Sequence, residues 1–352
     1  MPGRVTLDAG RDHVGATWGT VPERRGLDAA GILRAAADGE VRALVLLGCD
    51  PLGDFPDRRL AERAIANVEF LLVVGAFAED AAERANVVLA ASVWSEHRGS
   101  GSNLEGRVQR LAAKITAEGT TMASWQIACE LAARFGSDFG LETVEDVQNE
   151  IAAVAPAFAG VDARLIRQAR DGVVIPISDH PDELAFGPTQ GASGRSWEPI
   201  RPTIADDGTD AFTEEEARAR RTHRPPMPLH AWTAESARPG PAVPVNAYAL
   251  RLVAGRTLYG DDRHTIHSPS VARLIEPARL LVNPADRDRV VTSEGAVVRV
   301  STPTASLDLP VHADRATPRG VAFLAVNSTA PGARDLIDID APVTELRMET
   351  TS

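Results

Sequence analysis

The stretch "VRALVLLGCDPLGDFPD", residues 41–57, decides the predicted fold because an apolar run leads directly into a polar loop. Residues 41–48 are almost continuously apolar, which is typical of a strand buried on both faces of a sheet. The segment before it, residues 27–40, is Ala-rich and helix-like, with Asp28 as an expected N-cap and Gly39 as an expected stop signal. The stretch therefore predicts a helix followed by a buried strand.

The same order of helix and strand occurs twice more along the chain. Residues 56–67 have a helical pattern and precede the apolar run 68–77, and residues 78–86 precede the apolar run 87–91. Helices that alternate with apolar strands at this spacing are typical of a parallel sheet with crossover helices. We expect this α/β domain to occupy residues 1–155.

The remainder of the chain changes character twice. Residues 156–244 lose periodicity and become rich in Pro and Gly, which predicts a linker. Residues 245–345 contain short segments of alternating polarity separated by Pro and Gly, a pattern that favours a small closed β barrel.

Composition excludes several functions for the 352-residue chain. The chain has 49 acidic and 37 basic side chains and a formal charge of −12, so its surface repels phosphate backbones and anionic lipids, and we expect no nucleic-acid partner. No stretch approaches the roughly 20 apolar residues of a membrane span, and the N-terminus lacks the apolar core of a signal peptide. We expect a cytoplasmic chain without direct membrane insertion.

Cys49 and Cys129 are the only two cysteines. A four-cysteine zinc site or an iron–sulfur cluster held by this chain's cysteines alone is therefore excluded by count. Both thiols follow or interrupt apolar segments, and we expect them to be small buried side chains without reactivity.

Ligand loops in parallel sheets follow the carboxyl ends of the strands, so the segments after the three predicted strands are candidate sites. The richest is "SEHRGSGSNLEGRVQR", residues 95–110. The backbone N–H groups of residues 99–102 and the positive charges of Arg98, Arg107 and Arg110 are suited to bind a phosphate or a pterin. A surface turn has the same composition, so both interpretations stay open.

Other common sites have little support in the sequence. His264 and His267 are spaced so that they could meet on one helical turn, but no third metal ligand stands beside them at a convincing spacing. The chain contains no GxSxG, GxxxxGK[ST] or HExxH motif, and no GxGxxG motif follows a strand. We predict neither catalytic residues nor a metal site in this chain.

Four segments in the same order resemble a known family: "LGCDPLGDFPD", "SEHRGSGSNLEGRVQRLAAKI", "SWQIACELAARFG" and "LLVNPADRDRV". Together they are similar to the molybdopterin oxidoreductase superfamily. Within it, the chain resembles the molybdopterin oxidoreductase-like subunit of bacterial NADH–quinone oxidoreductase, respiratory complex I, in its actinobacterial form. The resemblance covers most of residues 1–150 and, more weakly, about 245–330. It implies a molybdopterin oxidoreductase-like α/β domain and a barrel of the molybdopterin-dinucleotide-binding type.

The resemblance implies that the chain is a structural or assembly part of the peripheral arm of complex I, the enzyme that carries electrons from NADH to quinone. The other subunits of the complex would be its partners and would hold it at the inner face of the cell membrane. In that family the iron–sulfur clusters lie in a cysteine-rich N-terminal part that this sequence lacks, so the clusters are expected in that part or in partner subunits. The chain would then be a fragment or a separate polypeptide, without redox centres and not catalytic alone; a truncated product without a function of its own is a further possibility.

The resemblance also implies a pterin site, which the complex I subunit generally keeps in shape without the cofactor. The residues of the family pattern that this sequence retains are Glu96, Gly99, Asn103, Glu105, Gly106, Arg107, Gln109 and, in the barrel, Asn283. His97 and Arg98 stand where Lys-Ala is usual, so we interpret the site as vestigial and expect no cofactor. In the alternative, the chain is a fragment of a molybdopterin-dependent oxidoreductase that binds a molybdopterin guanine dinucleotide, with Arg107 facing a phosphate and Asn103 a polar edge.

Overall fold

The computed structural model describes residues 7–78, 80–175, 177–178, 227–228, 249–291, 293–328 and 331–351. These residues form two compact units. The hairpin unit lies within residues 1–26 and 91–238, and the sheet–barrel unit lies within residues 27–90 and 239–352. The predicted domain 1–155 is thus divided between the units, because the chain leaves the hairpin unit after residue 26 and returns to it at residue 91.

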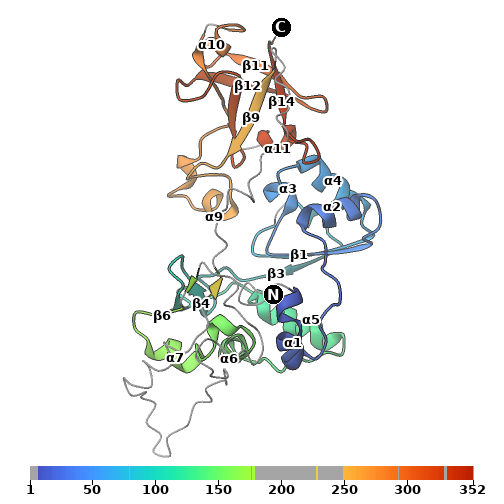
Figure 1. Cartoon of the computed structure of the whole chain (residues 1–352), viewed down its shortest axis with the longest axis vertical. Coiled ribbons are helices and arrows are strands. Elements are labelled where there is room, and N and C mark those ends of the chain that lie inside the picture. Colours follow the sequence, from blue (N-terminus) through green and yellow to red (C-terminus); the bar gives the residue numbers. More distant parts are fainter. Residues whose placement is uncertain are drawn as a thin grey trace, which may run out of the picture. The chain divides into compact units, whose positions relative to one another are not determined.

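The sheet–barrel unit begins with the predicted alternation of helices and strands (Figure 1). Its elements are α2 (Ala29–Ala37), β1 (Ala43–Leu47), α3 (Pro51–Asp54), α4 (Arg58–Asn67), β2 (Phe70–Gly75), η2 (Ala82–Arg84) and β3 (Val87–Ala90). Asp28 caps α2 by accepting a hydrogen bond from the Gly31 amide at 2.8 Å, and Gly39 ends it with a φ of 79°. The strands form a parallel sheet in the order β1-β2-β3, which confirms the predicted sheet.

The prediction that β1 is buried on both faces is wrong. Leu44 and Leu46 pack into the core with α2 and α4, whereas Val45 is 56% exposed and Leu47 is 54% exposed. The physical reason is position: β1 is an edge strand of the sheet, and the core formed with the two helices covers one of its faces. In the central strand β2, residues 71–74 are all buried.

The second part of this unit is a closed barrel with strand order β10-β12-β11-β14-β9-β13, as the turn-rich alternating pattern predicts. Its elements are β9 (Leu250–Gly255), α9 (Arg263–Ile266), η5 (Ala272–Leu274), β10 (Leu280–Val282), α10 (Pro284–Arg287), β11 (Val297–Ser301), β12 (Ser306–Ala313), β13 (Val321–Ala325), α11 (Ala333–Leu336) and β14 (Glu345–Thr350). Apolar side chains from every barrel strand meet in one core, in which Leu280, Val300 and Leu324 are fully buried.

The barrel and the sheet are joined by polar contacts within their unit. Asp57, the N-cap of α4, accepts hydrogen bonds from the Leu60 amide at 3.0 Å and from the Ile339 amide at 3.2 Å. Arg34 on α2 donates to Asp340 at 2.6 Å. These contacts hold α2 and the start of α4 against the segment that follows α11.

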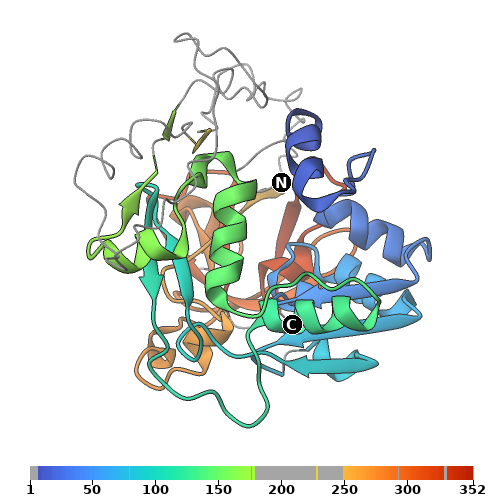
Figure 2. The ribbon, with the colours of Figure 1, turned by 90° about the horizontal axis from the view of Figure 1, so that it is seen from below.

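The hairpin unit is built around a small antiparallel sheet and three longer helices (Figure 2). Its elements are α1 (Leu7–Trp18), β4 (Gly99–Ser102), β5 (Arg107–Leu111), α5 (Ser124–Arg134), α6 (Val144–Val154), η3 (Pro156–Phe158), α7 (Ala163–Gln168), β6 (Val173–Val174), β7 (Ile177–Ser178) and β8 (Met227–Pro228). The core of the unit contains Val108, Val161, Ile166 and Ile175.

Residues 156–175, which the sequence assigns to the linker, form η3, α7 and β6 and supply much of this core. Their apolar side chains are spaced too irregularly to give a periodic signal. Most of the rest of the predicted linker, residues 179–226 and 229–244, lies outside the described residues. Among the helices that the structure describes, none combines the length and apolar character needed to cross a bilayer.

Candidate functional site

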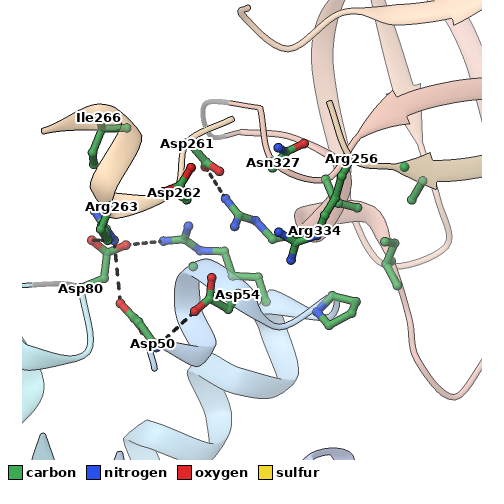
Figure 3. A pocket seen from close by; sticks show the side chains of 17 residues that line it. Asp50, Asp54, Asp80, Arg256, Asp261, Asp262, Arg263, Ile266, Asn327 and Arg334 are labelled. Atoms are coloured by element: carbon green, nitrogen blue, oxygen red, sulfur yellow. Dashed lines mark hydrogen bonds and ion pairs between the residues drawn. The ribbon is translucent and has the colours of Figure 1, made fainter. Parts of the chain in front are cut away.

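The larger described cavity lies in the sheet–barrel unit and has a volume of about 600 Å³. The loops that follow β1 and β2 form one wall, and the segment after β9 together with α11 forms another (Figure 3). The first wall is the carboxyl edge of a parallel sheet, where such folds place ligands. The location agrees with the expectation that chemistry resides after the predicted strands.

Asp50 anchors the sheet side of the cavity. The chain leaves β1 through Gly48, which has a φ of 64° and so takes the left-handed conformation that a side chain would strain. Asp50 then caps α3 by accepting from the Leu52 amide at 2.9 Å, and it accepts from the Ala81 amide at 3.3 Å. Its carboxylate is buried, and backbone N–H groups from the segments after β1 and β2 hold it in place.

Ion pairs lie both across the cavity and along its barrel wall. The Arg263 guanidinium on α9 lies 3.8 Å from the carboxylate of Asp50 and 3.8 Å from that of Asp80. Arg334 on α11 lies 2.6 Å from Asp261, and both side chains are largely buried. Figure 3 shows Arg263 pointing toward Asp50 and Asp80 on the sheet side, and Arg334 pointing toward Asp261 on its own wall. Much of the positive charge of the cavity is therefore engaged by carboxylates of the same cavity.

Arg58 extends this network toward α4. Its guanidinium lies 3.2 Å from Asp80 and 3.2 Å from Glu62, and 4.0 Å from Asp335. Desolvation by burial acts to lower the pKa of Arg58, but the hydrogen bond that Arg58 donates to Glu62 and the charges of Asp335 and Asp80 outweigh it and raise the pKa. Arg58 therefore stays charged and ties α4 to the cavity.

Asn327 shapes the loop that follows β9. Its side-chain oxygen accepts from the Thr257 amide at 2.9 Å, and its side-chain nitrogen donates to the Thr257 carbonyl at 3.0 Å. A Cβ atom at Gly260 would lie 1.9 Å from that nitrogen, so this close approach requires glycine. The loop carries Asp261 and Asp262 into the cavity wall.

Asp262 is held as a carboxylate at the start of α9. Partial burial acts to raise the pKa of Asp262, but hydrogen bonds from the Thr265 side chain and backbone outweigh this effect, and the pKa is lowered. Sequence reasoning missed Asn327, Arg263 and Arg334 as cavity residues. The only sequence signal was that Asn327 lies near the end of a predicted barrel segment, "GVAFLAVNS".

The predicted pterin residues before and within the hairpin make structural contacts. Glu96 accepts from the Val93 amide at 3.0 Å. The Asn103 side chain accepts from the amides of Glu105 at 3.0 Å and Arg107 at 2.9 Å, and so closes the turn between β4 and β5. These contacts give Glu96 and Asn103 a structural role in the segment.

Gly106 and Arg107 complete the same turn. Gly106 has a φ of 75°, which favours glycine. Arg107 donates to the Asp171 carbonyl at 2.9 Å and lies 3.5 Å from Glu105. Gln109 stands on β5 opposite Gly101.

Asn283 lies in the barrel, where it caps α10 by accepting from the Ala285 amide at 3.1 Å and donates to the Thr317 carbonyl at 3.0 Å. None of the eight predicted residues lines the 600 Å³ cavity, and Gly99 lines a smaller cavity in the hairpin unit. Whether they contact a pterin stays a prediction.

The two histidines with metal-like spacing pack on an aromatic ring. Phe77 stacks on His267 with ring centroids 4.7 Å apart, and it meets His264 edge-on at 5.4 Å. Within the described part of the chain, no group of three or more His, Cys, Asp or Glu side chains is arranged to hold a metal ion. These contacts give the histidines a packing role.

The prediction that both cysteines are buried is wrong. Cys49 is exposed, because it lies in the loop just past the end of β1, and Cys129 on α5 is partly exposed. Desolvation, with the nearby charges of Asp138, Glu150 and Glu130, raises the pKa of the Cys129 thiol, which lowers its thiolate fraction at neutral pH.

The parallel sheet and the closed barrel are shared with known proteins. Residues 6–134 match the molybdopterin oxidoreductase family. The chain therefore contains a molybdopterin oxidoreductase domain followed by a closed six-stranded barrel. The predicted fold class is confirmed.

Particular relatives are oxidoreductase subunits. The chain is 34% identical over 172 residues to the NADPH-Fe(3+) oxidoreductase subunit alpha of Geobacter sulfurreducens, a match that covers 49% of this chain and 20% of that protein. It is 24% identical over 343 residues to the assimilatory nitrate reductase catalytic subunit of Bacillus subtilis, covering 93% of this chain and 44% of that protein.

Among solved structures, acetylene hydratase from Pelobacter acetylenicus has the same fold over 92% of this chain and 46% of its own, with a TM-score of 0.60 and 16% identity. The chain thus spans less than half the length of each of these relatives. The resemblance to the molybdopterin oxidoreductase superfamily is confirmed, while the narrower resemblance to a subunit of NADH–quinone oxidoreductase stays a prediction.

Proposed function

We propose that this chain is a scaffold portion of a multi-subunit electron-transfer enzyme of the NADH–quinone oxidoreductase type, without redox centres of its own. The observation that carries the proposal is the internal charge balance of the 600 Å³ cavity. Arg58, Arg263 and Arg334 all form ion pairs with carboxylates that line the same cavity. The cavity is built to join the sheet to the barrel.

The charge of this cavity argues against a molybdopterin dinucleotide as its ligand. Five aspartates and four arginines line it, a formal lining charge of −1. Among the described residues, Arg256 is the one lining arginine without an acidic partner, and it is exposed. A diphosphate group would bring further negative charge beside Asp50 and Asp80, and it would have to displace Arg263 from both.

Two features of the sequence support the assignment to this type of enzyme. The colinear segments around "NLEGRVQR" resemble the molybdopterin oxidoreductase-like subunit of complex I, and two cysteines alone cannot ligate an iron–sulfur cluster. We therefore assign the electron carriers, and the attachment to the inner face of the membrane, to partner subunits.

The test is to tag the chain in its native cell, isolate it with its bound partners, and identify the partners by mass spectrometry and the metals by elemental analysis. We expect subunits that carry flavin and iron–sulfur clusters, and no molybdenum bound to the chain. Stoichiometric molybdenum in the released chain, or isolation without any such subunit, would contradict the proposal.

The second candidate function is binding of a molybdopterin guanine dinucleotide as part of a molybdopterin-dependent oxidoreductase. The volume of about 600 Å³ at the carboxyl edge of the sheet favours it. Freshly purified protein would then release a pterin that fluoresces after denaturation and oxidation. Absence of that fluorescence, measured against a known pterin protein as the standard, excludes this candidate.

A further inference from the structure

A second cavity lies in the hairpin unit, between the β4–β5 hairpin and the helices α6 and α7. Ser100 and Arg110 are direct partners across the hairpin and therefore project from the same face, and both line the cavity. Arg98, two residues before Ser100, and Arg167 on α7 line it as well. Three guanidinium-bearing residues from three segments thus converge on one small space.

The charge of this cavity is not balanced by the protein. Its one acidic lining residue is Glu145 on α6, which lies 3.7 Å from Arg98. Within the part of the chain that the structure describes, Arg110 and Arg167 have no acidic partner. In a chain with a formal charge of −12, a lining charge of +2 is a local excess. Converging like charges repel, so the arrangement favours an added anion.

The wall of the cavity is held in place by neutral hydrogen bonds. The Ser100 hydroxyl donates to the Gln148 side-chain oxygen at 2.7 Å, and the Gln148 side-chain nitrogen donates to the Val161 carbonyl at 2.9 Å. Gln148 is 7% exposed, so the bonds fix the hairpin against α6 (Figure 2). These bonds hold β4 against α6, while the side chains of Arg98, Arg110 and Arg167 are exposed.

The volume sets the size of the ligand. The cavity holds about 40 Å³, and one water-sized group needs roughly 10–15 Å³, so about three such groups fit. That space suits one small oxyanion held at the surface by the exposed arginines. Guanidinium groups bind phosphate oxygens with paired, charge-assisted hydrogen bonds.

We propose that Arg98, Arg110 and Arg167 form a binding site for one phosphate group, either inorganic phosphate or the terminal group of a small phosphate monoester. The Ser100 hydroxyl stays bonded to Gln148, and Glu145 stays paired with Arg98. It lies in the hairpin unit and is independent of the scaffold function proposed for the sheet–barrel unit.

The test is isothermal titration of the full chain with inorganic phosphate at constant ionic strength in chloride. We expect saturable binding of one phosphate per chain. The double variant Arg110→Gln/Arg167→Gln should bind at least about tenfold more weakly, because it loses two charge-assisted contacts. Arg319→Gln, which removes an exposed arginine from the barrel, is the matched control and should bind as the wild type does.

Two further measurements separate the outcomes. Glycerol 3-phosphate that competes with inorganic phosphate identifies a terminal phosphate as an accepted ligand, whereas phosphate binding alone identifies the free ion. The variant Arg110→Lys/Arg167→Lys, which keeps the charge, should retain part of the affinity. Equal phosphate binding by the wild type and the folded double Gln variant, or no saturable binding by either, would overturn the proposal.

Discussion

The two cavities contain the same kinds of charged side chain and differ in how those charges are paired. In the sheet–barrel unit, Arg263 and Arg334 meet carboxylates of the same cavity. In the hairpin unit, Arg110 and Arg167 stand beside Arg98 with Glu145 as the single lining acid. The comparison teaches that pairing, more than residue type, decides whether an arginine joins two parts of a fold or is available to bind an anion.

The largest expected effect comes from breaking a pair in the first cavity. Arg334→Met leaves the carboxylate of Asp261, which is 18% exposed, without its charge partner. We expect a loss of about 3 kcal/mol in the free energy of unfolding, at the lower end of the range for broken buried pairs because of that exposure. Urea denaturation followed by circular dichroism measures it.

The matched control for this change is Arg347→Met, which removes an exposed arginine from β14 of the same barrel. The control should unfold at nearly the wild-type urea concentration. If Arg334→Met and Arg347→Met shift the midpoint equally, the ion pair does not stabilise the cavity.

A smaller effect concerns α6, the helix that supports the second cavity. Hydrogen bonds from the Thr143 side chain and backbone lower the pKa of Asp146 below the ordinary range. A lowered folded-state pKa contributes stability that is present above about pH 4 and is lost as the pH falls through the lowered value. The wild type should therefore lose stability more steeply on acidification than Asp146→Asn.

Melting temperatures of both proteins between pH 7 and pH 2 check this prediction. The variant should be the less stable at neutral pH, and the difference should shrink as the wild-type carboxyl becomes protonated. A difference that stays constant down to pH 2 would show that the charge of Asp146 has no part in the cap.

The smallest expected effect distinguishes the two cavities most directly. Arg110→Gln removes a cation that has no acidic partner among the described residues, so the free energy of unfolding should stay within roughly 0.5 kcal/mol of the wild type. At low salt and without phosphate, the variant should be slightly the more stable because repulsion within the cavity is relieved. A loss as large as that of Arg334→Met would show that Arg110 serves a structural ion pair.

Local features of the fold were predictable because their causes lie within a few residues. Asp28 caps the start of α2 and Gly39 ends the helix, as the sequence predicts. An N-cap side chain and a residue in the left-handed conformation each act on the adjacent helical turn. The alternation of helices with apolar strands predicted the parallel sheet, and the turn-rich pattern predicted the barrel. Exposure of β1 was not predictable, since it depends on what covers each face.

The site was predictable only in part for the same reason. The loop around Asp50 could be placed at the carboxyl edge of the sheet from its position after a strand. The position of Arg263 in the site could not be predicted. Arg263 lies more than 200 residues beyond Asp50 in the sequence, and only the folding of the barrel brings the two side chains together. The sequence of the hairpin matched the family pattern. In the structure, the Asn103 side chain accepts a hydrogen bond from the Arg107 amide within the turn, and the Arg107 side chain donates to the Asp171 carbonyl.

The sequence by itself determined the alternating helices and strands of residues 27–90, the parallel and barrel classes, and the limit that two cysteines set on metal clusters. Those properties follow from local propensity, periodicity and composition, which act over short distances. The tertiary structure alone decided which cations are neutralised, because pairing requires side chains distant in sequence to lie within a few ångströms. The tertiary structure places Arg263 beside Asp50, and it places Arg98, Arg110 and Arg167 around one small cavity.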